Sequence, residues 1–191
     1  MKTPEFYLAN LHPAPKGSHT PFVPRVRTVI YRGMWAELPE NSHYKGPANP
    51  PVYGSDCPTF TSDVRMEKVG DIFESCKGNV EDETQKLGSG GGGPVEAVWW
   101  VADKGQQWRV RGNCYIVGDD IEGTGKEGNE NLSGVRTVKS EVGRRMRVVG
   151  DEEKVKEWSW KTEVTGQFGH MSPMLRGEQC ARSSSHFALT R

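Results

Sequence analysis

The sequence predicts a mainly β fold, an antiparallel barrel or sheet with a few helices, in a chain of 191 residues. Its 23 glycines and 12 prolines fall between segments rich in β-branched and aromatic residues, a pattern typical of strands joined by many turns. Helical periodicity is confined to two short segments. A chain of this length fits one domain and is long enough to bury a hydrophobic core.

The central element is a long predicted strand over residues 24–35, with the sequence PRVRTVIYRGMW. A strand of this length would extend about 40 Å, and such strands usually bend at a β-bulge. Alternation places Arg25 and Arg27 on one face and Arg32 on the other. Buried arginines require anionic partners, so the strand predicts a carboxylate or phosphate site. An edge strand with solvated arginines is the equal alternative.

The flanking strands are predicted from alternation and from turn signals. Residues 5–12 alternate weakly and would pair with the central strand. Residues 95–102 are almost continuously apolar, as in a strand covered on both faces, and residues 106–117 alternate cleanly. The Lys104-Gly105 turn between them predicts an antiparallel hairpin.

Two helices are predicted. The first follows a short strand over residues 57–62, has Asp63 as its N-cap and ends near Glu74. The second covers residues 152–168 and has Asp151 as its cap.

Three glycine-rich or proline-rich segments predict loops. Residues 38–56 predict an irregular excursion, and residues 118–134 predict an acidic surface loop. The glycine run at residues 89–93 could cradle a phosphate if it led into a helix, but it precedes a strand. It therefore predicts a flexible linker.

Composition argues against several classes of function. The 25 basic residues balance the 25 acidic ones, so no net field favours nucleic acid or an anionic membrane. No apolar run approaches a membrane span, and residues 1–13 lack the pattern of a signal peptide. The four cysteines and five histidines lack metal-ligand spacing. We therefore expect a cytoplasmic protein with reduced thiols and no metal site.

Four segments along the chain belong together as a pattern. They span the central strand, a strand-to-helix turn, the hairpin and the end of a later helix: RTVIYR at 27–32, FTSDVRMEK at 60–68, Trp99-Trp100 with QWRVRG at 107–112, and QFGHMSP at 167–173. In this order they resemble the pyridoxamine 5'-phosphate oxidase-like FMN-binding split barrels, in the branch with a Trp-Trp strand before a Gln-x-Arg strand. The resemblance implies a split β-barrel homodimer with FMN at the subunit interface, and an oxidoreductase of unknown small-molecule substrate.

The resemblance also assigns cofactor contacts. Arg27, Arg65 and Lys68 would hold the FMN phosphate with Ser62 beside them, while Arg32 would lie near the flavin ring. The remaining contacts would come from the central strand, the strand before the first helix, the hairpin and the partner chain: Thr28, Val29, Ile30, Thr61, Gln107 and, from the partner, Ser172. No catalytic acid or base is assigned.

Taken alone, these residues leave other interpretations open. Arg65 and Lys68 could form a solvated helix face, and Gln107 could be an exposed strand residue. We expect the three tryptophans of the hairpin in the core: Trp99, Trp100 and Trp108.

The resemblance ends near Gly177, so we expect a domain over residues 1–177 followed by an irregular tail at 178–191. Since the family continues with further strands, we expect an open barrel that holds FMN loosely. A binding module for flavin or heme without catalysis, with His170 as the first heme ligand to test, and an incomplete, non-functional product are the alternatives. The Arg-x-His pair of the pyridoxal-forming enzymes is absent from the sequence, so their substrate is not implied.

Overall fold

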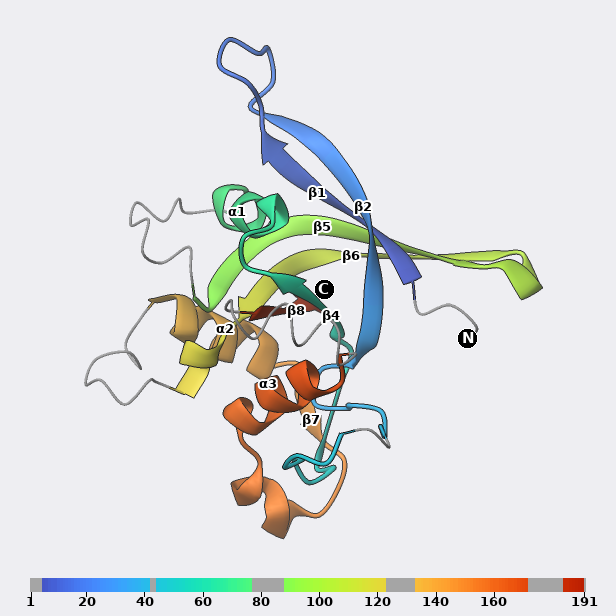
Figure 1. Ribbon diagram of the computed structural model, residues 1–191, viewed down its shortest axis with the longest axis vertical. Helices are drawn as coiled ribbons and strands as arrows, with labels where there is room; N and C mark the ends of the chain where they lie inside the picture. Colours follow the sequence, from blue (N-terminus) through green and yellow to red (C-terminus); the bar gives the residue numbers. More distant parts are fainter. Residues whose placement is uncertain (1–4, 42–43, 77–87, 123–132, 172–183, 191) are drawn as a thin grey trace.

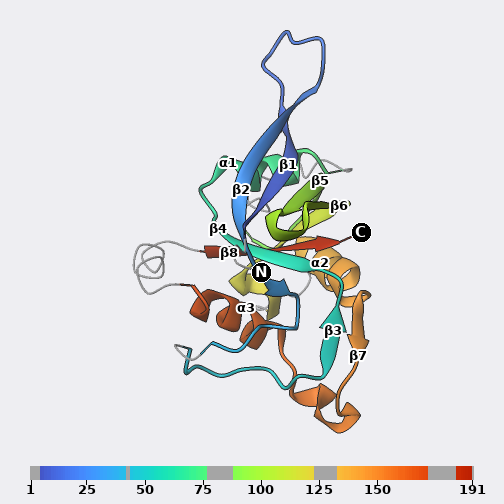
Figure 2. The same ribbon diagram turned by 90° about the vertical axis from the view of Figure 1, so that its right-hand side faces the viewer.

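A computed structural model describes residues 5–41, 44–76, 88–122, 133–171 and 184–190. Six antiparallel strands close into a barrel in the order β1-β2-β4-β8-β6-β5 (Figures 1 and 2). Their bounds are Glu5–Pro13 (β1), Phe22–Met34 (β2), Pro58–Asp63 (β4), Gly90–Val101 (β5), Gln106–Val117 (β6) and Ser184–Thr190 (β8). The mainly β, antiparallel barrel fold class predicted from the sequence is confirmed.

Strand β8 corrects the expectation of an irregular tail and an open barrel. Residues 184–190 pair with β4 on one side and with β6 on the other. Ala188 lies opposite Thr59 in β4 and opposite Tyr115 in β6. Ala188 and Leu189 are buried, so this strand completes both the hydrogen-bond ladder and the core.

The barrel interior is filled by alternate residues of the strands. Phe6 stacks on Trp99, with ring centroids 4.4 Å apart, and meets Phe60 edge to face. The predicted bulge in β2 is confirmed: Tyr31 pairs with Phe60 and Gly33 with Thr59, which leaves Arg32 as the extra residue. The extra residue shifts the alternation, so the side chains after Arg32 lie on the opposite face from the one that regular alternation would give.

Helix α1, Glu67–Glu74, packs on β1 and β5 at one end of the barrel (Figure 1). It buries Val69, Ile72 and Phe73. Its N-cap is Met66, without a side-chain cap, so the prediction of Asp63 as N-cap is wrong. Asp63 instead accepts a hydrogen bond from the Arg65 backbone N–H at 2.9 Å.

The glycine run is part of strand β5, and the prediction of a flexible linker is wrong. Gly90, Gly91 and Gly93 lie against α1: a Cβ on Gly93 would collide with Ser75 Oγ and would lie 2.6 Å from the Ile72 carbonyl oxygen. Gly91, at φ +89°, would place a Cβ 2.8 Å from an Ile72 methyl group. These positions need glycine because α1 packs too closely on the strand to leave room for a side chain.

A second core lies between the barrel and helices α2, Ser133–Gly143, and α3, Trp160–Gly169. Strands β3, Tyr53–Ser55, and β7, Met146–Val148, form a separate two-stranded sheet. Short 3-10 helices η2, Ala102–Lys104, and η3, Asp119–Glu122, follow strands β5 and β6. Among the residues that the structure describes, no helix is long and apolar enough to cross a membrane.

The predicted helix over residues 152–168 is divided in two. Asp151 caps the 3-10 helix η5, Glu152–Glu157, by accepting from the Glu153 N–H. Ser159 caps α3 by accepting from the Thr162 N–H. The break between them turns the chain so that Trp158 and Trp160 meet edge to face in the second core.

Candidate functional site

The barrel wall is split between β2 and β4 near α1. Strand β2 pairs with β4 only through Tyr31, Gly33 and Met34, whereas β4 continues to Asp63 beside β8. In the described part of the chain, the edge of β2 over residues 24–30 that faces β4 therefore has no paired strand. Backbone donors and acceptors on such an edge are available to a ligand.

Three predicted site residues meet at this opening. Arg27 pairs with the core residue Leu8 and points to the inner face of β2. Lys68, on the first turn of α1, donates a hydrogen bond of 2.6 Å to Ser62 Oγ at the end of β4. Lys68 and Ser62 are both buried, so the ammonium is held away from solvent.

The electrostatics of this group favour an anion. Desolvation lowers the pKa of Lys68, the nearby Arg27 charge lowers it further, and Asp63 opposes the shift. A partly desolvated ammonium that is also repelled by a guanidinium gains from a bound anion. This is the physical character expected of a phosphate-binding group.

Asp71, which the sequence analysis did not single out as a site residue, is the carboxylate of this cluster. It is almost fully buried on α1 and accepts from Asn10 Nδ2 at 2.6 Å. Its other oxygen bonds His12 Nδ1 at 2.6 Å, while Arg27 lies 3.4 Å away. The buried Asn10 Oδ1 has no hydrogen-bond partner among the described residues.

Arg65 is placed differently from Lys68 and Arg27. Its side chain is 54% exposed and is bound in bidentate fashion by Asp63, with Nε 2.8 Å from Oδ1. This hydrogen bond and the Asp63 charge raise the pKa of Arg65. Arg65 is therefore on the surface beside the cluster and already has an anionic partner.

A second group lies on the outer face of the barrel. Arg32, at the bulge, donates from Nε to Thr61 Oγ1 at 3.3 Å, and burial lowers the pKa of Arg32. Thr28 is exposed, Ile30 is half-buried, and Val29 points inward to the core. The structure thus places these central-strand residues on two faces of β2.

The other two predicted FMN contacts, Gln107 and Ser172, are not part of the cation cluster or of the Arg32 group. Gln107 is exposed beside the hairpin turn, opposite Trp100. Ser172 lies outside the described residues. Trp99 is buried as expected, but Trp100 and Trp108 are 56% and 62% exposed, so their prediction as core residues is wrong.

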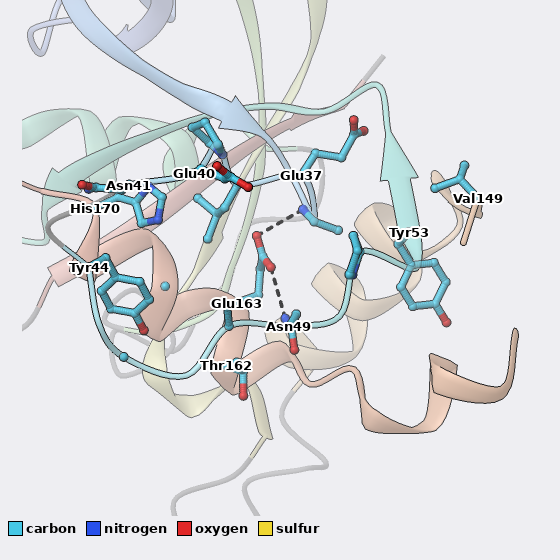
Figure 3. A pocket seen from close by; sticks show the side chains of 17 residues that line it. Glu37, Glu40, Asn41, Tyr44, Asn49, Tyr53, Val149, Thr162, Glu163 and His170 are labelled. Atoms are coloured by element: carbon cyan, nitrogen blue, oxygen red, sulfur yellow. Dashed lines mark hydrogen bonds between the residues drawn. The ribbon is translucent and has the colours of Figure 1, made fainter. Parts of the chain in front are cut away.

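The structure also contains a cavity of about 720 Å³ that the sequence did not predict (Figure 3). It lies between α3 and the segment that follows β2, and it exposes Glu37, Glu40 and Tyr44. Its inner wall is Glu163, which accepts from the Ala36 N–H at 3.2 Å and from Asn49 Nδ2 at 3.1 Å. Burial raises the pKa of Glu163, and these hydrogen bonds oppose the shift.

His170 connects this cavity to the outer-face group. It lines the cavity, and burial followed by the charge of Arg32 lowers its pKa. No group of three or more potential metal ligands occurs in the described segments.

Comparison with known families relates the first part of the chain to a described domain. A family model described as pyridoxamine 5'-phosphate oxidase, FMN-binding domain, matches residues 1–118. This range includes β1 to β6, and with them Arg27, Ser62 and Lys68. No curated protein and no solved structure matches the chain.

Proposed function

The chain belongs to the pyridoxamine 5'-phosphate oxidase FMN-binding domain family, and we propose that it is a flavoprotein that binds FMN at the opening between β2 and β4. The observation that carries this proposal is the pair of neighbouring cations at that opening, the buried Lys68 and Arg27, whose side chain is 21% exposed. FMN carries a phosphate dianion, and two converging cations with a hydroxyl are a suitable set of partners for it.

Within this proposal, each predicted contact has a distinct role. Lys68 and Arg27 bind the phosphate, Ser62 Oγ orients the ammonium, and Arg65 adds a weaker, solvent-exposed attraction. Thr28, Val29 and Ile30 contribute the backbone of the unpaired β2 edge to the polyol and ring. Arg32 and Thr61 lie beside the ring, where a cation favours a reduced flavin.

We propose an oxidoreductase activity for the loaded protein. Bound FMN would supply hydride acceptance from a small organic donor, and the chain would bind and orient both partners. The cavity lined by His170 is the proposed route for the donor, because His170 lies near enough to Arg32 for the guanidinium charge, after burial, to lower the His170 pKa.

The proposed assembly is a homodimer in which Ser172 of the partner chain completes each FMN site. Large apolar side chains are exposed on the barrel surface and hairpin: Tyr7, Val26, Trp100 and Trp108. Exposed aromatic groups on this scale commonly mark an interface. Light scattering should give about twice the chain mass of 21.3 kDa; a monomer that binds FMN fully would refute the interface contribution.

The proposal is tested on the purified protein by its visible spectrum and by titration of the apoprotein with FMN. Flavin gives two broad visible bands and its fluorescence is quenched on binding, whereas heme gives one sharp intense band. Saturable FMN binding with one site per chain would support the proposal. A heme spectrum, or no response to FMN, would overturn it.

A further inference from the structure

Asp71 places a negative charge inside the cluster that should receive the phosphate. We propose that Asp71 is an internal competitor of the flavin phosphate, which sets how much the phosphate contributes to binding. This inference rests on the proposed FMN site but concerns the selectivity between phosphorylated and unphosphorylated flavin.

The three partners of Asp71 are not equally close. Asn10 and His12 each lie at 2.6 Å, one on each carboxylate oxygen, whereas Arg27 lies at 3.4 Å. The carboxylate is thus fixed to β1 by two short hydrogen bonds, and Arg27 is the partner most easily withdrawn. Arg27 is also 21% exposed in its side chain, so it has room to turn toward a ligand.

The local charges make the competition unavoidable. Arg27 lies 3.4 Å from Asp71, and Lys68 is influenced by the charges of Arg27 and Asp63, so each cation already has a carboxylate nearby before any ligand arrives. A phosphate dianion at Arg27 would also face Asp71, whose side chain is 3% exposed and therefore poorly screened. Asp71 thus stabilises the Arg27 guanidinium in the empty site and weakens the bound phosphate.

Riboflavin provides the internal comparison, since it has the same ring and polyol but no phosphate. Replacing Asp71 with the isosteric Asn removes the charge and should tighten FMN about tenfold, while riboflavin affinity stays within about twofold. Glu67→Gln is the matched control. Glu67 is on the same helix and pairs with Arg25 on the surface, so its loss changes the net charge equally without touching Arg27.

A second variant should change the affinity for FMN in the opposite direction. His12→Ala removes the hydrogen bond that holds one oxygen of Asp71 away from Arg27. The freed carboxylate should bind Arg27 more closely, so FMN should weaken about threefold with riboflavin unchanged. If the Asp71→Asn protein shows no cooperative unfolding transition and so is not folded, His12→Ala alone tests whether Asp71 competes with the phosphate.

Dissociation constants for both flavins, measured by fluorescence quenching on each full-length variant, separate the outcomes. A raised FMN-to-riboflavin preference in D71N and a lowered one in H12A would support the inference. Unchanged preferences in variants that bind flavin would overturn the inference and leave the proposed function intact. If wild-type protein bound neither flavin, the proposed function would fail, and the inference with it.

Discussion

The Lys68 ammonium lies 2.6 Å from the Ser62 hydroxyl oxygen at the point where β4 separates from β2. The hydroxyl is neutral, so it accepts a hydrogen bond from the ammonium without cancelling the positive charge. The pair thus holds a desolvated cation ready for an anionic ligand, and its chemistry can be tested separately from that of the flavin ring.

Replacing Lys68 with Ala should weaken FMN binding by about 1–3 kcal/mol, the range for a hydrogen bond to a charged group. Riboflavin binding should change little, because it has no phosphate to lose. Arg65→Ala is the comparison, and we expect a smaller loss because Arg65 is surface-exposed and bound by Asp63. Equal losses for FMN and riboflavin in K68A, measured by quenching titration, would contradict a phosphate contact.

The pH dependence of FMN binding should report on Lys68. Its pKa in the apoprotein is lowered by desolvation and then by Arg27, whereas a bound phosphate would raise it. FMN affinity should therefore fall as the pH rises through the lowered pKa of Lys68 toward the ordinary lysine value of 10.5. Lys68→Arg should flatten this fall, since arginine stays protonated. A wild-type profile identical to that of K68R would argue against the assignment.

Glu163 should make the apoprotein less stable as the pH rises. Because burial raises its pKa in the folded state, the folded protein binds the proton more tightly than the unfolded chain does. Its contribution to stability is complete below the ordinary value of 4.5 and is lost as the pH rises through the raised pKa. Urea unfolding across this window should show the fall in wild type and its absence in Glu163→Gln. A slope that persists in E163Q would assign it to other groups.

Two glycines near α1 should respond to alanine in opposite ways. At Gly70, on α1, an added Cβ meets nothing within 4 Å, so G70A should stabilise by about 0.5–1 kcal/mol. At Gly93, a Cβ would collide with the Ile72 carbonyl oxygen at 2.6 Å, so G93A should destabilise by about 1–3 kcal/mol. Melting temperatures measure both changes, and a G93A protein as stable as wild type would show that α1 does not pack on β5 as described.

Strand β8 should contribute strongly to stability. Leu189 is 2% exposed and belongs to the barrel core, so Leu189→Ala should cost about 2–5 kcal/mol of unfolding free energy. Val149→Ala is the control, since Val149 is 65% exposed after β7 and should change stability by less than about 0.5 kcal/mol. Denaturant unfolding gives both values, and equal effects would mean that β8 is not docked in solution.

Local sequence patterns predicted the strands with strong side-chain alternation and the tight turn of the hairpin. They did not predict β8, because its pairing with β4 joins residues far apart in sequence and its segment shows little apolar periodicity. The glycine run was misread for a related reason. Its place in β5 depends on α1 packing above it, which intrinsic strand propensity does not encode.

The cations of the site could be predicted from residue type, whereas the carboxylate among them could not. His12 and Asp71 are 59 residues apart, and only the packing of α1 on β1 brings them together. The cavity beside Glu163 likewise depends on Ala36 and Asn49, which meet α3 through tertiary contacts.

The position of β8 in the chain also constrains the order of events during synthesis. Strands β4 and β6 each require β8 as a neighbour, so no barrel can close while residues 184–190 are still inside the ribosome. Until then the nascent chain presents unpaired strand edges beside aromatic side chains. Chaperone contact during translation should therefore concentrate on β4 and β6, and slowing the ribosome before residues 184–190 emerge should prolong that exposure.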